Sequence, residues 1–118
     1  MSIINSKRIF LSQRFGPAEA AVVEHLLGDV GGELTGSAEG RYWELTKNQL
    51  IITIHVQPIE SRLADCKEAL LALGLLPEEV REVVTVQGLN ESAELCRLIS
   101  DRLAAELEGI TGVAEQCS

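Results

Sequence analysis

The segment Leu50–Gln57 constrains the fold more than any other part of the chain, because it alternates as a β-strand does and is apolar on both sides. One side takes Leu50, Ile52, Ile54 and Val56, and the other takes Ile51, Thr53 and His55. Pro58 ends the strand, since proline cannot donate a hydrogen bond to a neighbouring strand. Apolar residues on both sides predict a strand in the middle of a sheet.

Helical and strand periodicities alternate along the rest of the chain. Helices are predicted at Pro17–Leu27, Glu60–Leu73 and Glu91–Glu108, and further strands at Lys7–Phe15, Glu33–Thr35, Arg41–Leu45 and Glu82–Gln87. The second helix has an apolar stripe of Ile59, Leu63, Cys66, Leu70 and Leu73. This order predicts one α+β domain over residues 1–118, a two-layer sandwich with a mostly antiparallel sheet and three helices. The preferred topology is a ferredoxin-like variant, β-α-β-β-α-β-α, with a short C-terminal tail at 111–118 that could add a strand.

Charge limits the classes of partner. The chain has 18 acidic and 10 basic residues, a formal net charge of −8, and most of the surplus falls in residues 60–118. Nucleic-acid binders and proteins that adsorb to anionic lipid need clustered Lys and Arg, so we expect a protein partner and neither nucleic acid nor membrane. Met1–Arg8 lacks the order of a signal peptide, and the three cysteines form no C-x-x-C pair. These features predict a cytoplasmic protein.

The sequence contains no recognisable catalytic pattern. His25 and His55 lack the spacing of a metal site, and the glycine loop 36–40 is neither a P-loop nor a nucleophile elbow. Cys66 and His55 could form a nucleophile and its base only if the fold brought them together in a cleft. We therefore expect no enzyme activity, no catalytic residue, no metal and no cofactor.

Two groups of residues are candidates for partner binding. Tyr42 and Trp43 are adjacent in a predicted strand, so one should lie in the core and the other at the surface. The second group is acidic and flanks the last predicted strand and the start of the last helix: Glu78, Glu79, Glu82, Glu91 and Glu94. If the fold gathers this group at one end, it forms an acidic contact surface. The alternative is a solvated group that stabilises helix starts.

The C-terminal half leads from the β-branched run Val83–Val86 through Gly88–Asn90 into the helical segment Leu95–Gly109. In this layout, in size and in acidity, the chain resembles the small, acidic, cytoplasmic immunity proteins of bacterial polymorphic-toxin systems. The resemblance implies a non-catalytic inhibitor that binds and neutralises a cognate basic toxin domain through an acidic surface. It transfers no binding residue.

Two other functions remain open. A secretion-effector chaperone is also a small acidic α+β protein, and it would dimerise and expose an apolar surface for an unfolded segment. A small-ligand-binding regulatory module of ferredoxin-like fold would instead have a pocket lined by convergent polar groups.

Overall fold

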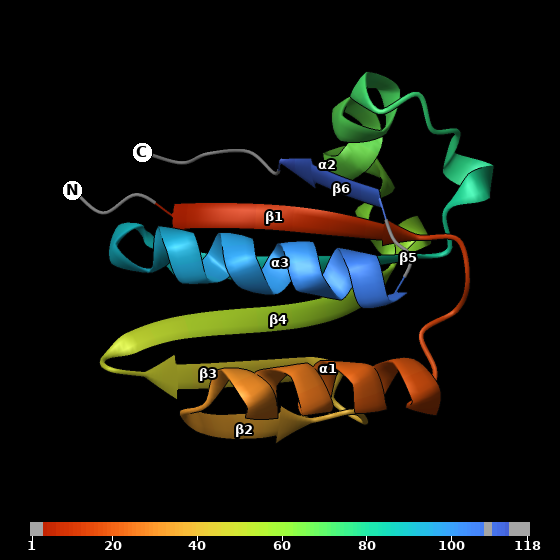
Figure 1. Cartoon of the computed structure of the whole chain (residues 1–118). Helices are drawn as coiled ribbons and strands as arrows, with labels where there is room; N and C mark the ends of the chain where they lie inside the picture. The colour runs from red at the N-terminus through yellow and green to blue at the C-terminus, as the bar shows by residue number, and fades with distance from the viewer. Residues whose placement is uncertain (1–3, 108–109, 114–118) are drawn as a thin grey trace.

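A six-stranded antiparallel sheet is the centre of the structure (Figure 1). The computed structural model describes residues 4–107 and 110–113. The strands are β1 (Ile4–Leu11), β2 (Glu33–Ser37), β3 (Tyr42–Lys47), β4 (Leu50–Pro58), β5 (Glu82–Leu89) and β6 (Ile110–Val113). Across the sheet they lie in the order β2-β3-β4-β5-β1-β6, and each neighbouring pair is antiparallel. The strand predicted from its two apolar sides, β4, is indeed internal.

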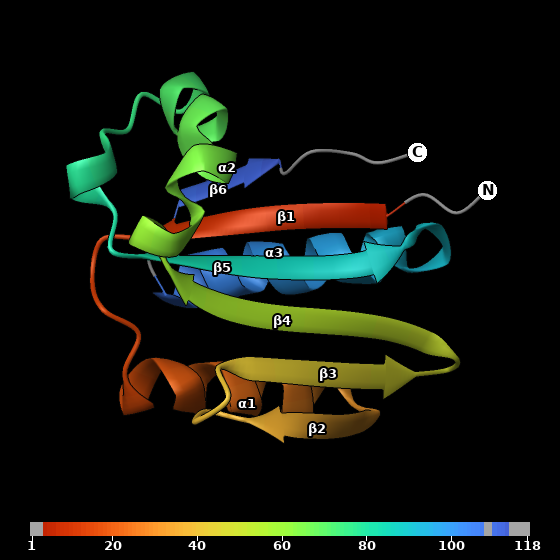
Figure 2. The same cartoon turned by 180° about the vertical axis from the view of Figure 1, so that it is seen from behind.

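Three α-helices lie on the two faces of the sheet. They are α1 (Pro17–Val30), α2 (Ile59–Ala72) and α3 (Ala93–Leu107), and the short 3₁₀ turns η1 (Pro77–Glu79) and η2 (Asn90–Ser92) flank β5. Figures 1 and 2 show α1 and α3 on one face and α2 on the other, near one end of the strands. The predicted α+β class with an antiparallel sheet and three helices is confirmed.

The main core lies between the sheet and the pair α1 and α3. From β4 it takes Ile52, Ile54 and Val56, as the alternation predicts, while Ile51 on the opposite side is exposed. The helices contribute mainly Leu, Val and Ile side chains, which include Val23, Leu26, Leu27, Ile99 and Leu103. Because both helices use this one face, most of the other face depends on α2 for cover.

A smaller second core lies under α2. Phe10 and Val83 from the sheet meet Ile59, Cys66 and Leu70 from α2, together with Val80. Leu63, which belongs to the predicted apolar stripe, is 42% exposed because α2 covers only one corner of this face. The rest of the face is uncovered, and there Tyr42 and Gln87 are exposed and Thr53 and His55 half-buried.

The sheet is a variant of the predicted split β-α-β arrangement. In this sheet β1 lies between β5 and β6 and is antiparallel to both. At the opposite edge β2 forms a hairpin with β3. The strand β6 begins one residue before the predicted tail and ends within it, at Val113, while residues 114–118 are outside the described residues.

Candidate functional site

The predicted acidic group does not gather at one end of the molecule. Glu78 and Glu79 belong to η1, just before β5 begins, whereas Glu91 and Glu94 follow the end of β5. All four are exposed. A strand of eight residues spans roughly 25 Å, so the two pairs lie at opposite ends of β5. The condition for a single acidic contact surface, that the fold gathers all five residues at one end, is therefore not met, because β5 separates the two pairs.

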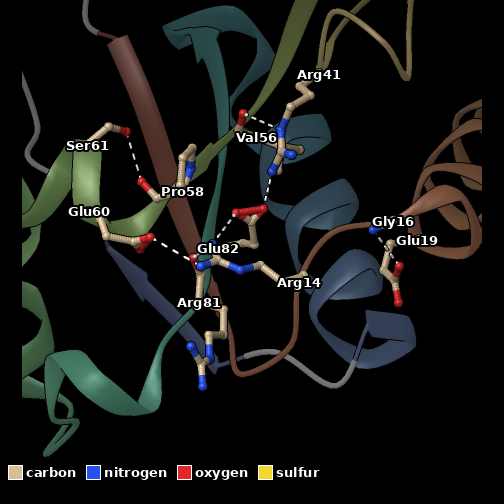
Figure 3. A network of polar contacts seen from close by, with 10 residues as sticks. All are labelled: Arg14, Gly16, Glu19, Arg41, Val56, Pro58, Glu60, Ser61, Arg81 and Glu82. Atoms are coloured by element: carbon tan, nitrogen blue, oxygen red, sulfur yellow. Dashed lines mark hydrogen bonds and ion pairs between the residues drawn. The ribbon is translucent and has the colours of Figure 1, made fainter.

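Glu82 is not at the surface. It is the first residue of β5 and points to the same face as Val84 and Val86, and only 1% of it is exposed. Its carboxylate forms ion pairs with Arg41 and with Arg14, whose Nη1 lies 3.6 Å from Oε1 (Figure 3). A buried carboxylate needs such partners, since an unpaired buried charge is strongly destabilising. Glu82 is therefore a structural residue rather than a contact for a partner.

Arg14 and Arg41 complete this buried ion cluster and had no signal in the sequence. Arg14 also reaches Glu60 at 3.3 Å, which connects the segment after β1 to α2. Arg41 donates from Nε to the carbonyl oxygen of Val56 and lies over the ring of Phe15, 5.9 Å from its centroid. Arg14 follows β1 and Arg41 precedes β3, so the pairing of strands distant in the chain brings both arginines close to Glu82.

Tyr42 and Trp43 divide between surface and core, as their adjacency predicts. Trp43 is buried, and its Nε1 donates to Oε2 of Glu24 at 3.1 Å. Tyr42 is exposed on the uncovered face, where its ring packs edge-on against His55 with centroids 5.8 Å apart. Of this pair only Tyr42 is accessible to a partner.

Exposed leucines gather at the end of α2 and in the loop after it. Leu71 is 69% exposed and Leu76 is 54% exposed, with Leu73 between them in sequence and also exposed. We name these three residues the leucine patch. Glu78 and Glu79 follow directly in η1, which packs against α2. Three exposed leucines therefore precede, within a few residues, two of the predicted acidic residues, which are also exposed.

Cys66 and His55, which could act as a nucleophile and its base only if they met in a cleft, occupy different environments. Cys66 is fully buried in the core beneath α2, and this burial raises the pKa of its thiol. A buried neutral thiol is a poor nucleophile. His55 lies on the uncovered face, where desolvation lowers its pKa, as do Arg62 and Arg41 to a lesser extent. The described residues contain no group of three or more His, Cys, Asp or Glu side chains able to hold a metal ion.

No known protein family and no curated protein matches this chain. Within residues 4–107 and 110–113, no helix combines the length and the apolar character needed to cross a bilayer.

Proposed function

We propose that this chain is a non-catalytic protein-binding protein and that the leucine patch with Glu78 and Glu79 is its contact surface. The observation that carries the proposal is the exposure of Leu71 and Leu76, two large apolar side chains close together in the chain. Contiguous exposed apolar groups with a polar edge are typical of protein interfaces. Burial of such leucines by a partner removes their apolar surface from water and stabilises the complex.

The acidic edge favours a partner with basic groups beside an apolar surface. Carboxylates at the rim of an interface accelerate association with a positively charged partner more than they strengthen the final complex. A toxin nuclease domain has such a surface, because it binds phosphate through Lys and Arg. The preferred specific function is therefore that of an immunity protein. Of the five acidic candidates, only Glu78 and Glu79 are kept as contact residues for the partner.

The same exposed leucines favour a secretion-effector chaperone as the second candidate. Such a protein would hold an unfolded segment on apolar surface, to which the exposed Tyr42 and Ile51 of the sheet face beside α2 could contribute. The two functions differ in the partner's state. An immunity protein binds a folded domain, whereas a chaperone binds a segment that has no fold of its own.

Co-purification from the source cells, followed by binding measurements with the purified partner, tests the proposal. Leu71→Ser with Leu76→Ser should abolish binding, while Leu98→Ser should retain it, because Leu98 is 51% exposed but lies on α3. Glu78→Lys with Glu79→Lys should slow association, and Glu91→Lys with Glu94→Lys is the matched charge control. Equal binding by all four variants would exclude the leucine patch as the contact surface.

A further inference from the structure

Basic groups gather where α2 lies over the sheet, although the chain as a whole is acidic. Strand register places Arg8 of β1 next to Thr85 of β5, and Thr85 next to His55 of β4. At this place α2 adds Arg62 and Lys67. Above Arg8 is a pocket of about 550 Å³, which we name the Arg8 pocket, lined by Arg8, Arg62, Ala64, Asp65, Lys67 and Glu68.

Two buried polar atoms beneath or beside the Arg8 pocket lack hydrogen-bond partners. Arg8 donates from Nη1 to the carbonyl oxygen of Asp65 at 3.0 Å, but its Nε is buried without a hydrogen-bond partner. The buried Oγ1 of the adjacent Thr85 also has none. Buried polar groups almost always have a partner in folded proteins, so the hydrogen-bonding capacity of Arg8 is only partly used here. Among the described residues, neither Arg8 nor Lys67 forms an ion pair.

Two hydrogen bonds to neighbouring side chains fix the position of Arg62, the second arginine of the pocket. Arg62 donates to Oε1 of Gln57 at 2.5 Å and to Oδ2 of Asp65 at 3.1 Å. The carboxylate of Asp65 is therefore already occupied, and Glu68 is the other acid that lines the pocket. Three cations against two carboxylates make this area locally positive. Burial and, after it, the charge of Arg62 lower the pKa of His55, so His55 responds to at least one cation of the pocket.

We propose that the Arg8 pocket binds an oxyanion, either a phosphate or a carboxylate group. Arginine suits this role because its planar guanidinium presents several donors that match two oxygens of such a group. Arg8 has donors left after its bond to Asp65, and Arg62 and Lys67 add positive charge beside it. The ligand would compensate the unpaired charge of Arg8 and of Lys67.

Nuclear magnetic resonance titration tests this proposal with the two histidines as reporters. Inorganic phosphate and sodium acetate are added in separate titrations, and sodium chloride at matched ionic strength is the control for screening. Binding should move the His55 ring signals and raise the pKa of His55, because the anion offsets the nearby cations. His25 should not respond, since it lies on α1, on the opposite face, beside Asp29. Response to phosphate alone or to acetate alone identifies which group the pocket prefers.

Substitutions connect the response to the pocket. Arg8→Gln should weaken binding about tenfold, the effect of losing a charge-assisted hydrogen bond. Arg97→Gln makes the same charge change on α3 and should leave the affinity unchanged. If Arg8→Gln fails to fold, the double variant Lys67→Gln with Arg62→Gln provides the same test. Circular dichroism checks that each variant is folded. A His55 response no larger than that to sodium chloride, or an affinity unaffected by these variants, would overturn the proposal.

Discussion

Replacing Glu82 by glutamine tests the stabilising role of the buried ion cluster. The Glu82 side chain is 2% exposed, whereas the side chains of its partners Arg41 and Arg14 remain 36% and 59% exposed. Removal of one member of a fully buried pair costs about 3–5 kcal/mol. Here both arginines still reach water after the substitution, so the lost charge-assisted hydrogen bonds dominate. We expect a decrease of about 2 kcal/mol in the free energy of unfolding.

Urea denaturation measures this decrease, with the emission of the single tryptophan as the signal. Trp43 is buried in the folded state, so its emission reports exposure to water on unfolding. For a chain of 118 residues the expected loss corresponds to a decrease in Tm of about 8 °C. Glu82→Lys should be more destabilising still, because it places a third cation between Arg14 and Arg41.

Glu79→Gln is the control, since it removes the same charge from an exposed position three residues before Glu82 in the chain. It should change the free energy of unfolding by less than about 0.5 kcal/mol. The reasoning would be refuted if Glu82→Gln were no more destabilising than this control. A loss as large as that of a fully buried pair would instead show that the arginines do not gain water when the carboxylate is removed.

Three further results are expected. Because the fold lowers the pKa of His55, its ring is protonated at a higher pH in the unfolded chain than in the folded chain. The free energy of unfolding should therefore decrease as the pH falls from about 6.5 to the folded pKa. Urea titrations across this range should show that His55→Gln removes this part of the pH dependence. Burial raises the pKa of the Cys66 and Cys96 thiols, so both should react with a maleimide only when urea unfolds the chain, as peptide mass spectrometry would show; rapid labelling of the native protein would contradict this. Gly36→Ala should lower the free energy of unfolding by roughly 2 kcal/mol or more, because φ is +107° and a Cβ would lie 2.2 Å from a main-chain oxygen of β3. Gly28→Ala in α1, where nothing lies within 4 Å of the added Cβ, should be neutral or stabilising. Thermal denaturation measures both.

Local periodicity predicts the elements of this fold well. The alternation of residues 50–57 reflects the two environments of β4, and the helical spacing after Pro17 reflects the face of α1 that meets the sheet. The helix α1 runs to Val30, slightly beyond the predicted end, and stops where Gly31 adopts a φ of 86°. These features depend on neighbours in the sequence, so the sequence alone contains them.

The candidate surfaces depend on packing between distant segments, which periodicity does not encode. Leu63 has the spacing of a core residue, yet α2 lies at a corner of the sheet and leaves it exposed. Glu82 resembles its exposed neighbours in sequence, but register brings Arg41 and Arg14 to it. The Arg8 pocket likewise requires α2 to lie over β1. By contrast, the exposure of Glu78 and Glu79 can be predicted from the sequence, because both lie in a polar turn.

The position of β1 in the sheet has a consequence for how the protein is made. This strand precedes the other five described strands in the chain, yet its two neighbours are β5 and β6, with Leu11 opposite Glu82 and Phe10 opposite Ile110. Pairing over such separations is slow, because much loop entropy must be lost before the contacts form. During translation β1 must wait, with Ile9 and Phe10 uncovered, until the ribosome has released β5 and β6. The nascent protein is therefore most vulnerable to aggregation before these two strands have left the ribosome.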